Sequence, residues 1–268
     1  MSDAAQRANE QIAEVVAGRV ERVGYAVATL DDGEVRGERL DEVFTQASAI
    51  KIPIVWRLDA AAEAGELSLD EVLPVAIESG SGGCGVLQHF TPGVSQLTLG
   101  DIAVLMIVLS DNVATNLLIE RVGMDRVNEQ LESLGLEQTR LRRLMMDAAA
   151  REAGYENTST PREAARLMGE LSRQADSGDA AATRTLATLR LRKESPFTEA
   201  LYDRSPIPEL ACKPGMLDGV RTEWSLVETG GNDGAAYTLC VMAEGGTDRQ
   251  LKTLLEDAAA ACFEAMTA

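Results

Sequence analysis

The chain has 268 residues, of which 45% are apolar and 25% charged, as in globular proteins that bury a full core. The net charge of −18 argues against nucleic acid and anionic membrane as partners, because both require a basic surface. No apolar run approaches the ~20 residues that a membrane-spanning helix needs.

The predicted elements run from helix to strands, through a helical insert, and back to strands and a helix. The first part contains a helix over 6–16, a strand over 24–30, a turn at 31–33 and a hairpin partner over 34–38. The insert, residues 49–191, carries helical apolar spacing at 104–109, 113–122, 127–134 and 161–171. The last part contains strands over 209–213, 223–228 and 236–243 and a helix over 248–265.

This order predicts an α/β (α+β) fold in which both chain ends build one antiparallel sheet flanked by helices. Residues 1–48 and 192–268 would form the α/β subdomain, and residues 49–191 an inserted all-helical subdomain. Clefts between such subdomains are common sites for small ligands, so the active site is expected between them.

The first candidate site is S-A-I-K at residues 48–51, at the start of the insert. Positions i and i+3 share a helix face, so the amine of Lys51 can reach the hydroxyl of Ser48. A serine becomes a nucleophile when a neighbouring base takes its proton, and a helix N-terminus favours the developing oxyanion. The alternative is a plain N-cap at Ser48 and a solvated Lys51.

The second motif is S-D-N-V-A-T-N-L-L at residues 110–118, between two helical runs. Ser110, Asp111 and Asn112 are also good N-cap residues, which is the alternative interpretation. Together with the S-x-x-K pattern, however, this run resembles the active-site loop of class A β-lactamases and penicillin-binding proteins. The resemblance implies that Ser110 relays a proton to the leaving nitrogen, that Asn112 contacts the substrate amide, and that Asp111 braces the turn.

The third motif, K-P-G at residues 213–215 on a predicted strand, occupies the place of the family's K-T-G. The resemblance implies a positive charge on Lys213 beside Ser110, a close approach of substrate at Gly215, and an oxyanion hole from the N–H groups of Ser48 and Met216. Pro214 stands where the family has threonine, so a hydroxyl contact to the substrate carboxylate is missing.

Two further features bear on the edges of the predicted site. Arg221 is a candidate to bind the substrate carboxylate, and a surface arginine is the alternative. Residues 82–88, G-G-C-G-V-L-Q, resemble the family loop at the mouth of the cleft, and T-S-T-P at 158–161 resembles the end of its Ω-loop. A packing or surface role is expected for His89, because this chemistry requires no imidazole.

The chain departs from the family in the Ω-loop, where R-x-E-x-x-L-N is expected and R-L-M-M-D-A-A stands at 143–149. Met145 replaces the glutamate that activates the hydrolytic water, and Ala149 replaces the asparagine. Asp147 is a candidate alternative base. The alternative for Asp147 is a salt bridge to Arg142 or Arg143 that holds the loop.

These observations predict a serine hydrolase that forms an acyl-enzyme on Ser48 with β-lactams or related amides and esters. The alternatives are a penicillin-binding or esterase-type protein with slow turnover, and a catalytically idle ligand-binding module. The family that the chain resembles includes enzymes of antibiotic resistance, so the resemblance implies such a role. The predicted partner is a small-molecule substrate, and the sequence leaves the oligomeric state open.

The cysteines and the single histidine predict that neither a metal nor a cofactor takes part. Cys84, Cys212, Cys240 and Cys262 lack C-x-x-C spacing, and His89 is the only histidine. Free thiols are expected, with a Cys212–Cys240 disulfide as the alternative. The N-terminus lacks a basic region followed by an apolar one, which predicts a cytoplasmic protein; an exported mature fragment with an added methionine is the alternative.

Only four of the 25 basic residues are lysine. An acidic, lysine-poor chain with few aromatics is typical of a high-salt cytoplasm, where screening weakens self-repulsion; a high-GC genome that favours arginine codons is the alternative. We therefore expect activity and the midpoint of thermal unfolding to rise between low and multimolar KCl. A midpoint that stays level or falls would favour codon bias.

Overall fold

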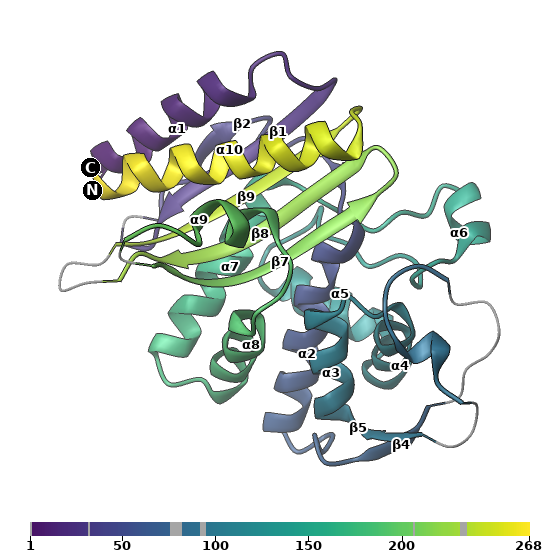
Figure 1. Cartoon of the computed structure of the whole chain (residues 1–268). Helices are drawn as coiled ribbons and strands as arrows, with labels where there is room; N and C mark the ends of the chain where they lie inside the picture. Colours follow the sequence, from purple (N-terminus) through teal and green to yellow (C-terminus); the bar gives the residue numbers. More distant parts are fainter. Residues whose placement is uncertain (1, 32, 76–81, 92–94, 206, 231–234) are drawn as a thin grey trace.

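A five-stranded antiparallel sheet built from both ends of the chain organises the molecule (Figure 1). The computed structural model describes residues 2–31, 33–75, 82–91, 95–205, 207–230 and 235–268. The strand order is β2-β1-β9-β8-β7. The bounds are β1 Arg22–Thr29, β2 Arg36–Glu38, β7 Glu209–Leu217, β8 Val220–Glu228 and β9 Ala236–Glu244. The predicted fold class is confirmed, and so are the predicted strands.

Helices from the two chain ends cover one face of this sheet. They are α1 (Ser2–Val16), α9 (Pro196–Leu201) and α10 (Asp248–Thr267), and α1 and α10 run side by side in Figure 1. Helix α10 begins with a capping box between Thr247 and Gln250. The central strand β9 is buried from Tyr237 to Ala243, which explains its continuous apolar sequence.

The helical insert lies on the other face of the sheet. Its helices are α2 Lys51–Glu63, α3 Leu99–Val108, α4 Asn112–Val122, α5 Met124–Ser133, α6 Ala148–Glu152, α7 Pro161–Asp176 and α8 Ala180–Arg190. The predicted runs 113–122 and 161–171 fall within α4 and α7, and the runs 104–109 and 127–134 end one residue beyond α3 and α5. The sequence analysis missed two short ladders, β3 Phe44–Thr45 with β6 Thr158–Ser159 and β4 Val72–Pro74 with β5 Gln96–Thr98, because two or three residues carry no periodic signal.

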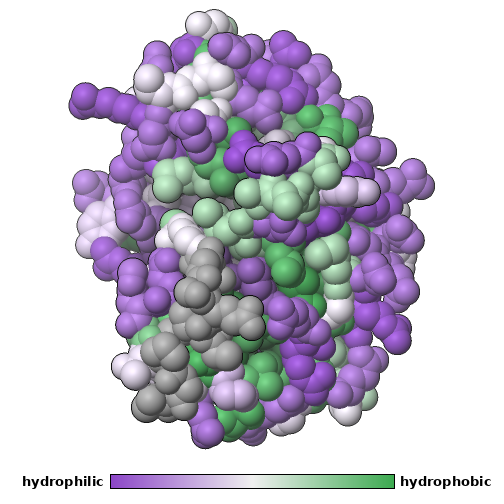
Figure 2. All heavy atoms as spheres, turned by 90° about the vertical axis from the view of Figure 1, so that its right-hand side faces the viewer, coloured by the Kyte–Doolittle hydropathy of each residue, from purple (hydrophilic) through white to green (hydrophobic). Residues whose placement is uncertain are grey.

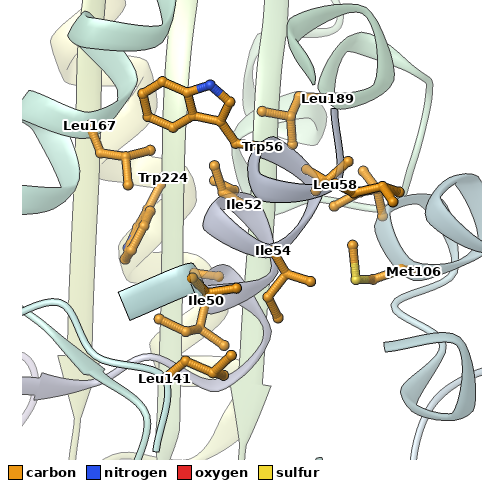
Figure 3. Packing of buried hydrophobic residues seen from close by; sticks show 14 of the residues in the cluster. Ile50, Ile52, Ile54, Trp56, Leu58, Met106, Leu141, Leu167, Leu189 and Trp224 are labelled. Carbon is orange, nitrogen blue, oxygen red and sulfur yellow. The ribbon is translucent and has the colours of Figure 1, made fainter. Parts of the chain in front are cut away.

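Helix α2 is the axis of the main core. Its side chains are apolar on nearly all sides, as expected of a helix that is surrounded by protein. Figure 3 shows Ile54, Trp56 and Leu58 of α2 among side chains from neighbouring elements, including Trp224 of β8 and Leu167 of α7. Burial of each such aliphatic side chain contributes roughly 1.5–3 kcal/mol to the free energy of folding. The packing of α2 therefore fixes the position of the helix and of the residues at its start.

The cysteines are free thiols, and the alternative of a Cys212–Cys240 disulfide is wrong. Strand β8 lies between the two residues, because Cys212 of β7 pairs with Ser225 and Cys240 of β9 pairs with Trp224.

His89 ends the 3₁₀ turn η2 (Leu87–His89) and is exposed, which agrees with a surface role. Among the described residues, no helix combines the length and apolar character needed to cross a bilayer. The division into two subdomains stays a prediction.

Candidate active site

Ser48 lies at the start of the central helix, in a 3₁₀ turn η1 (Ala47–Ile50) that continues directly into α2. Side chains three residues apart align along a 3₁₀ helix, so Ser48 and Lys51 share one side. The N-cap interpretation of Ser48 is wrong, because the turn is preceded by Gln46 and makes no side-chain cap bond. Ser48 is half-buried and lines two pockets.

Strand β7 approaches this turn so closely that a side chain at Gly215 would collide with it. A Cβ there would lie 2.7 Å from the carbonyl oxygen of Gln46 and 2.9 Å from the backbone nitrogen of Ser48. Thr222 Oγ1 donates to the carbonyl of Gln46 at 3.0 Å, and Trp224 Nε1 donates to Gln46 Oε1 at 2.8 Å. The sheet thus fixes the backbone that carries Ser48.

Lys51 is wholly buried, so a solvated lysine is excluded. Its Nζ donates to the carbonyl of Ser110 at 2.8 Å, to Ser110 Oγ at 3.1 Å and to Asn112 Oδ1 at 3.0 Å. Burial lowers the pKa of Lys51 well below its ordinary value, and the charge of Lys213 lowers it further. An amine that releases its proton readily can take the proton of a nearby hydroxyl.

Ser110 has φ +52°, in the left-handed region that few non-glycine residues adopt. Its neighbour Asp111 braces this turn, since its carboxylate accepts hydrogen bonds from Val86 N at 2.7 Å, Leu87 N at 2.9 Å and Ala114 N at 3.0 Å. The last of these bonds caps α4. Asp111 is therefore both N-cap and brace.

Lys213 brings a second buried amine to Ser110. Its Nζ donates to Ser110 Oγ at 3.2 Å and to the carbonyl of Pro214 at 3.0 Å. Burial, and then the charge of Lys193, lowers the pKa of Lys213 to about 8. The Ser110 hydroxyl thus lies between the amines of Lys51 and Lys213.

Behind Lys213 lies a buried polar cluster that the sequence analysis missed. Glu223 accepts hydrogen bonds from Ser195 Oγ and, at 3.3 Å, from the backbone nitrogen of Phe197. Burial raises the pKa of Glu223 to about 7. Lys193 reaches the sulfur of Cys212 at 4.0 Å. A charged residue within a buried strand, such as Glu223 between Thr222 and Trp224, is the signal that could have found this cluster.

Glycines let the loop at 82–88 close over Asn112 and Asp111. A Cβ at Gly83 would lie 2.5 Å from Asn112 Nδ2, and one at Gly85 would overlap the Asp111 carboxylate. Asn112 Nδ2 also donates to the carbonyl of Gly82 at 3.3 Å. The loop therefore forms one wall of the cleft, beside Asn112.

Met145, which the sequence analysis aligned with the family's Ω-loop glutamate, lines the same pocket of about 300 Å³ as Ser48. Asn116 holds the Met145 backbone with two hydrogen bonds: its Oδ1 accepts from Met145 N at 2.8 Å, and its Nδ2 donates to the Met145 carbonyl at 3.1 Å. The sequence analysis quoted Asn116 in the S-D-N motif without a role.

The salt bridge considered for Asp147 is wrong. Asp147 caps α6, accepting from Ala150 N at 2.9 Å, while Arg143 pairs with Glu156 at 2.6 Å. Asp147 lines the same pocket as Ser48 and Met145. Asp147 therefore borders the pocket, while its Oδ1 accepts the capping hydrogen bond from Ala150 N.

Two adjoining spaces meet at Ser48. The first is walled by Met145, Met146, Met216 and Asn112. The second, a groove of about 420 Å³ along β7, includes Ser110 and Lys213 in its lining. The face that carries α6 is mostly hydrophilic, with hydrophobic residues gathered across its middle (Figure 2).

Met216 lies on the last strand of the sheet, β7, and is paired with Arg221 on the neighbouring strand β8. Strand β7 is an edge strand, so one row of its N–H groups is free to face the cleft. Arg221 lines the groove but is already paired with Asp248 at 2.7 Å, and its Nη2 also reaches Met216 Sδ at 3.1 Å. Binding a substrate carboxylate at Arg221 would have to compete with that ion pair.

Among the described residues, no three His, Cys, Asp or Glu side chains gather into a group of the kind that holds a metal ion. A hydroxyl between two buried amines, next to a half-buried serine at a helix start, defines a serine-hydrolase type of site on a β-lactamase/transpeptidase-like fold. The chain belongs to the beta-lactamase enzyme family, whose model matches residues 7–266.

Individual relatives agree with this assignment. A β-lactamase of Rhodobacter capsulatus is 33% identical over 141 residues, which are 50% of this chain and 47% of that relative, so the match spans about half of the relative's length. The crystal structure of a β-lactamase from Sphaerobacter thermophilus is 28% identical with a TM-score of 0.86, covering 98% of this chain and 97% of that one.

A structure named PBP-A is 26% identical with a TM-score of 0.83, covering 97% of this chain and 96% of its own. A mutant of PBP-A, 25% identical with a TM-score of 0.83 over 100% of this chain and 97% of its own, was solved as an acyl-enzyme complex with penicillin G. The similarity thus includes both a β-lactamase and a PBP-A mutant that penicillin G has acylated.

Proposed function

We propose that this protein forms an acyl-enzyme on Ser48 with β-lactams or related amides and esters, and that it releases the acyl group slowly. The observation that carries the proposal is the hydrogen-bonded row Lys51–Ser110–Lys213 beside Ser48. The similarity to PBP-A, a mutant of which was solved as an acyl-enzyme complex with penicillin G, supports a penicillin-binding protein as the second candidate.

The positions of these groups support the following route of acylation. Lys51, whose pKa is lowered by burial, takes the proton of Ser48 as its oxygen attacks the carbonyl. The N–H groups of Ser48 and Met216 stabilise the oxyanion. As the C–N bond breaks, Ser110 gives its proton to the leaving nitrogen and is reprotonated from the Lys51 or Lys213 ammonium.

Deacylation lacks an equivalent group. Hydrolysis of the ester needs a base that holds and deprotonates a water near its carbonyl, and Met145 offers only a thioether. The carboxylate of Asp147 lines the pocket but is engaged as the cap of α6. We therefore propose that the acyl-enzyme accumulates, because it forms faster than it is hydrolysed.

The proposal is tested by following intact mass after mixing the protein with a fluorescent penicillin. A stable or slowly decaying adduct supports it. Fast turnover without an adduct would leave a β-lactamase with another deacylating base, and no adduct and no turnover would favour an idle binding module.

The acylation rate constant kcat/KM should fall as the pH rises through about 8, where Lys213 titrates. Below this pH the Lys213 ammonium faces Ser110 and the substrate carboxylate, and above it the charge is lost. At the acid end the rate should fall as Lys51 becomes protonated. The pH profile of adduct formation measures both the acid limb and the alkaline limb of this rate dependence.

Lys193→Met provides the sharper test, because it removes a charge that lowers the pKa of Lys213. The alkaline limb should move to higher pH in this variant. Arg166→Gln, which removes a charge from a separate cavity beside α7, should leave the limb in place. An unmoved limb in Lys193→Met would contradict the assignment to Lys213.

A further inference from the structure

The groove beside Ser48 gathers positive charge in a protein of net charge −18. Five basic side chains line it against two acidic ones, and three of the chain's four lysines are among them. The fourth, Lys51, lies next to the groove through its bond to Ser110. The basic lining residues are Arg192, Lys193, Lys213, Arg221 and Lys252.

Neighbouring carboxylates neutralise two of these charges. Arg221 pairs with Asp248 at 2.7 Å, and Lys252 pairs with Glu199 at 2.6 Å. Glu199 is one of the two acidic residues of the lining, which leaves Glu194 as the other. Lys213, Lys193 and Arg192 thus remain in the lining against Glu194, with the buried Glu223 near the two lysines, so the groove keeps an excess of positive charge.

Arg192 is exposed and, within the described part of the chain, forms no ion pair; its guanidinium lies 5.4 Å from the ring centre of Tyr202. Lys193 beneath it donates to the backbone carbonyl of Leu189. The groove continues past both residues into a space bounded by Thr198 and Tyr202. A ligand in the groove can thus extend from Ser48 to Arg192.

This groove lies on the leaving-group side of Ser48, because Ser110, which protonates the leaving nitrogen, lines it. Asn112 and Met145 line the other pocket. The first anionic group of a β-lactam would face Lys213. A second one, further along the leaving group, would meet Arg192.

We infer that Arg192, with the charge of Lys193 behind it, forms a subsite for a second anionic group on the leaving-group side of the substrate. The inference rests on the proposed function for the orientation of the ligand. The preferred substrate class is therefore dianionic: an acyl compound whose leaving part carries a carboxylate, sulfonate or phosphate besides the usual carboxylate.

Binding tests this without the chemical step. Two mandelamido-cephalosporins that differ only at the C3 tetrazole, N-methyl in one and N-sulfomethyl in the other, are titrated calorimetrically into Ser48→Ala at equal ionic strength. We expect the sulfonate compound to bind on the order of fivefold more tightly. Ser48→Ala with Arg192→Gln should lose that preference, and Ser48→Ala with Arg166→Gln should keep it.

Equal affinity for the two compounds, a preference that survives Arg192→Gln, or binding of neither compound would overturn the inference. Arg192 is exposed, so its replacement should leave the fold intact, and circular dichroism checks this. The wild-type adduct experiment tests the proposed function separately. An acyl-enzyme with both compounds alongside equal affinities would remove the subsite and leave the proposed function standing.

Discussion

Replacing Ser48 by alanine is expected to abolish covalent labelling by penicillins and cephalosporins. Ser48 pairs a helix start with a lysine three residues later, and it touches both spaces in which the two halves of a substrate would lie. Without its oxygen no ester can form, whatever the state of the amines. Intact-mass analysis after incubation with a chromogenic cephalosporin measures the result.

Two control variants separate loss of the nucleophile from loss of the fold. Ser177→Ala changes a serine at the end of α7, outside the cleft, and should label like the wild type. Ser110→Ala should still label, but about 10²–10⁴-fold more slowly, as expected when a proton relay is lost. If the Ser48→Ala adduct persists, another residue is the nucleophile.

Restoring the family's deacylating base is expected to accelerate hydrolysis of the acyl-enzyme and so to allow rapid turnover of penicillins. The wild type is expected to show a burst with penicillins followed by a slow steady state, because general-base assistance is typically worth ~10²–10⁴-fold. Met145→Glu with Ala149→Asn would place a carboxylate in the pocket that Ser48 lines. The slow phase should then accelerate by about 10²-fold or more, as followed by stopped-flow absorbance.

The geometry of Asn116 supports this design, since its two hydrogen bonds are made to the Met145 backbone and do not depend on the Met145 side chain, which is buried. Asp147→Asn is the matched control. Asparagine caps a helix as well as aspartate does, so this variant should keep α6 and leave the slow phase unchanged. A fast wild type whose turnover falls in Asp147→Asn would instead make Asp147 the base. A double variant with an unaltered slow phase would show that the loop alignment is wrong.

Local patterns were sufficient for most of the fold. The strands from 22–29 and 209–244 and the helices α1, α3, α4, α5, α7 and α10 carry their periodicity in contiguous residues, so they could be read without the tertiary structure, whereas α8 was not predicted. The two short ladders could not, because their pairing depends on segments more than 100 residues apart for β3 and β6 and on only three residues each for β4 and β5. The 3₁₀ start of the central helix was missed for a similar reason, since it depends on contacts with β7.

The sequence by itself determined the residue types of the site: a serine and lysine three apart, the S-D-N run, the K-P-G strand and a methionine in place of a carboxylate. Only the tertiary structure decided which of them meet. The bonds from Lys51 and Lys213 to Ser110 cross 59 and 103 residues, and burial, together with the charge of a neighbouring lysine, lowers the pKa of both amines. Ion-pair choices also depended on the fold: Arg221 pairs with Asp248, and Arg143 pairs with Glu156 and not with Asp147, because charged side chains take whichever partner the fold brings within reach.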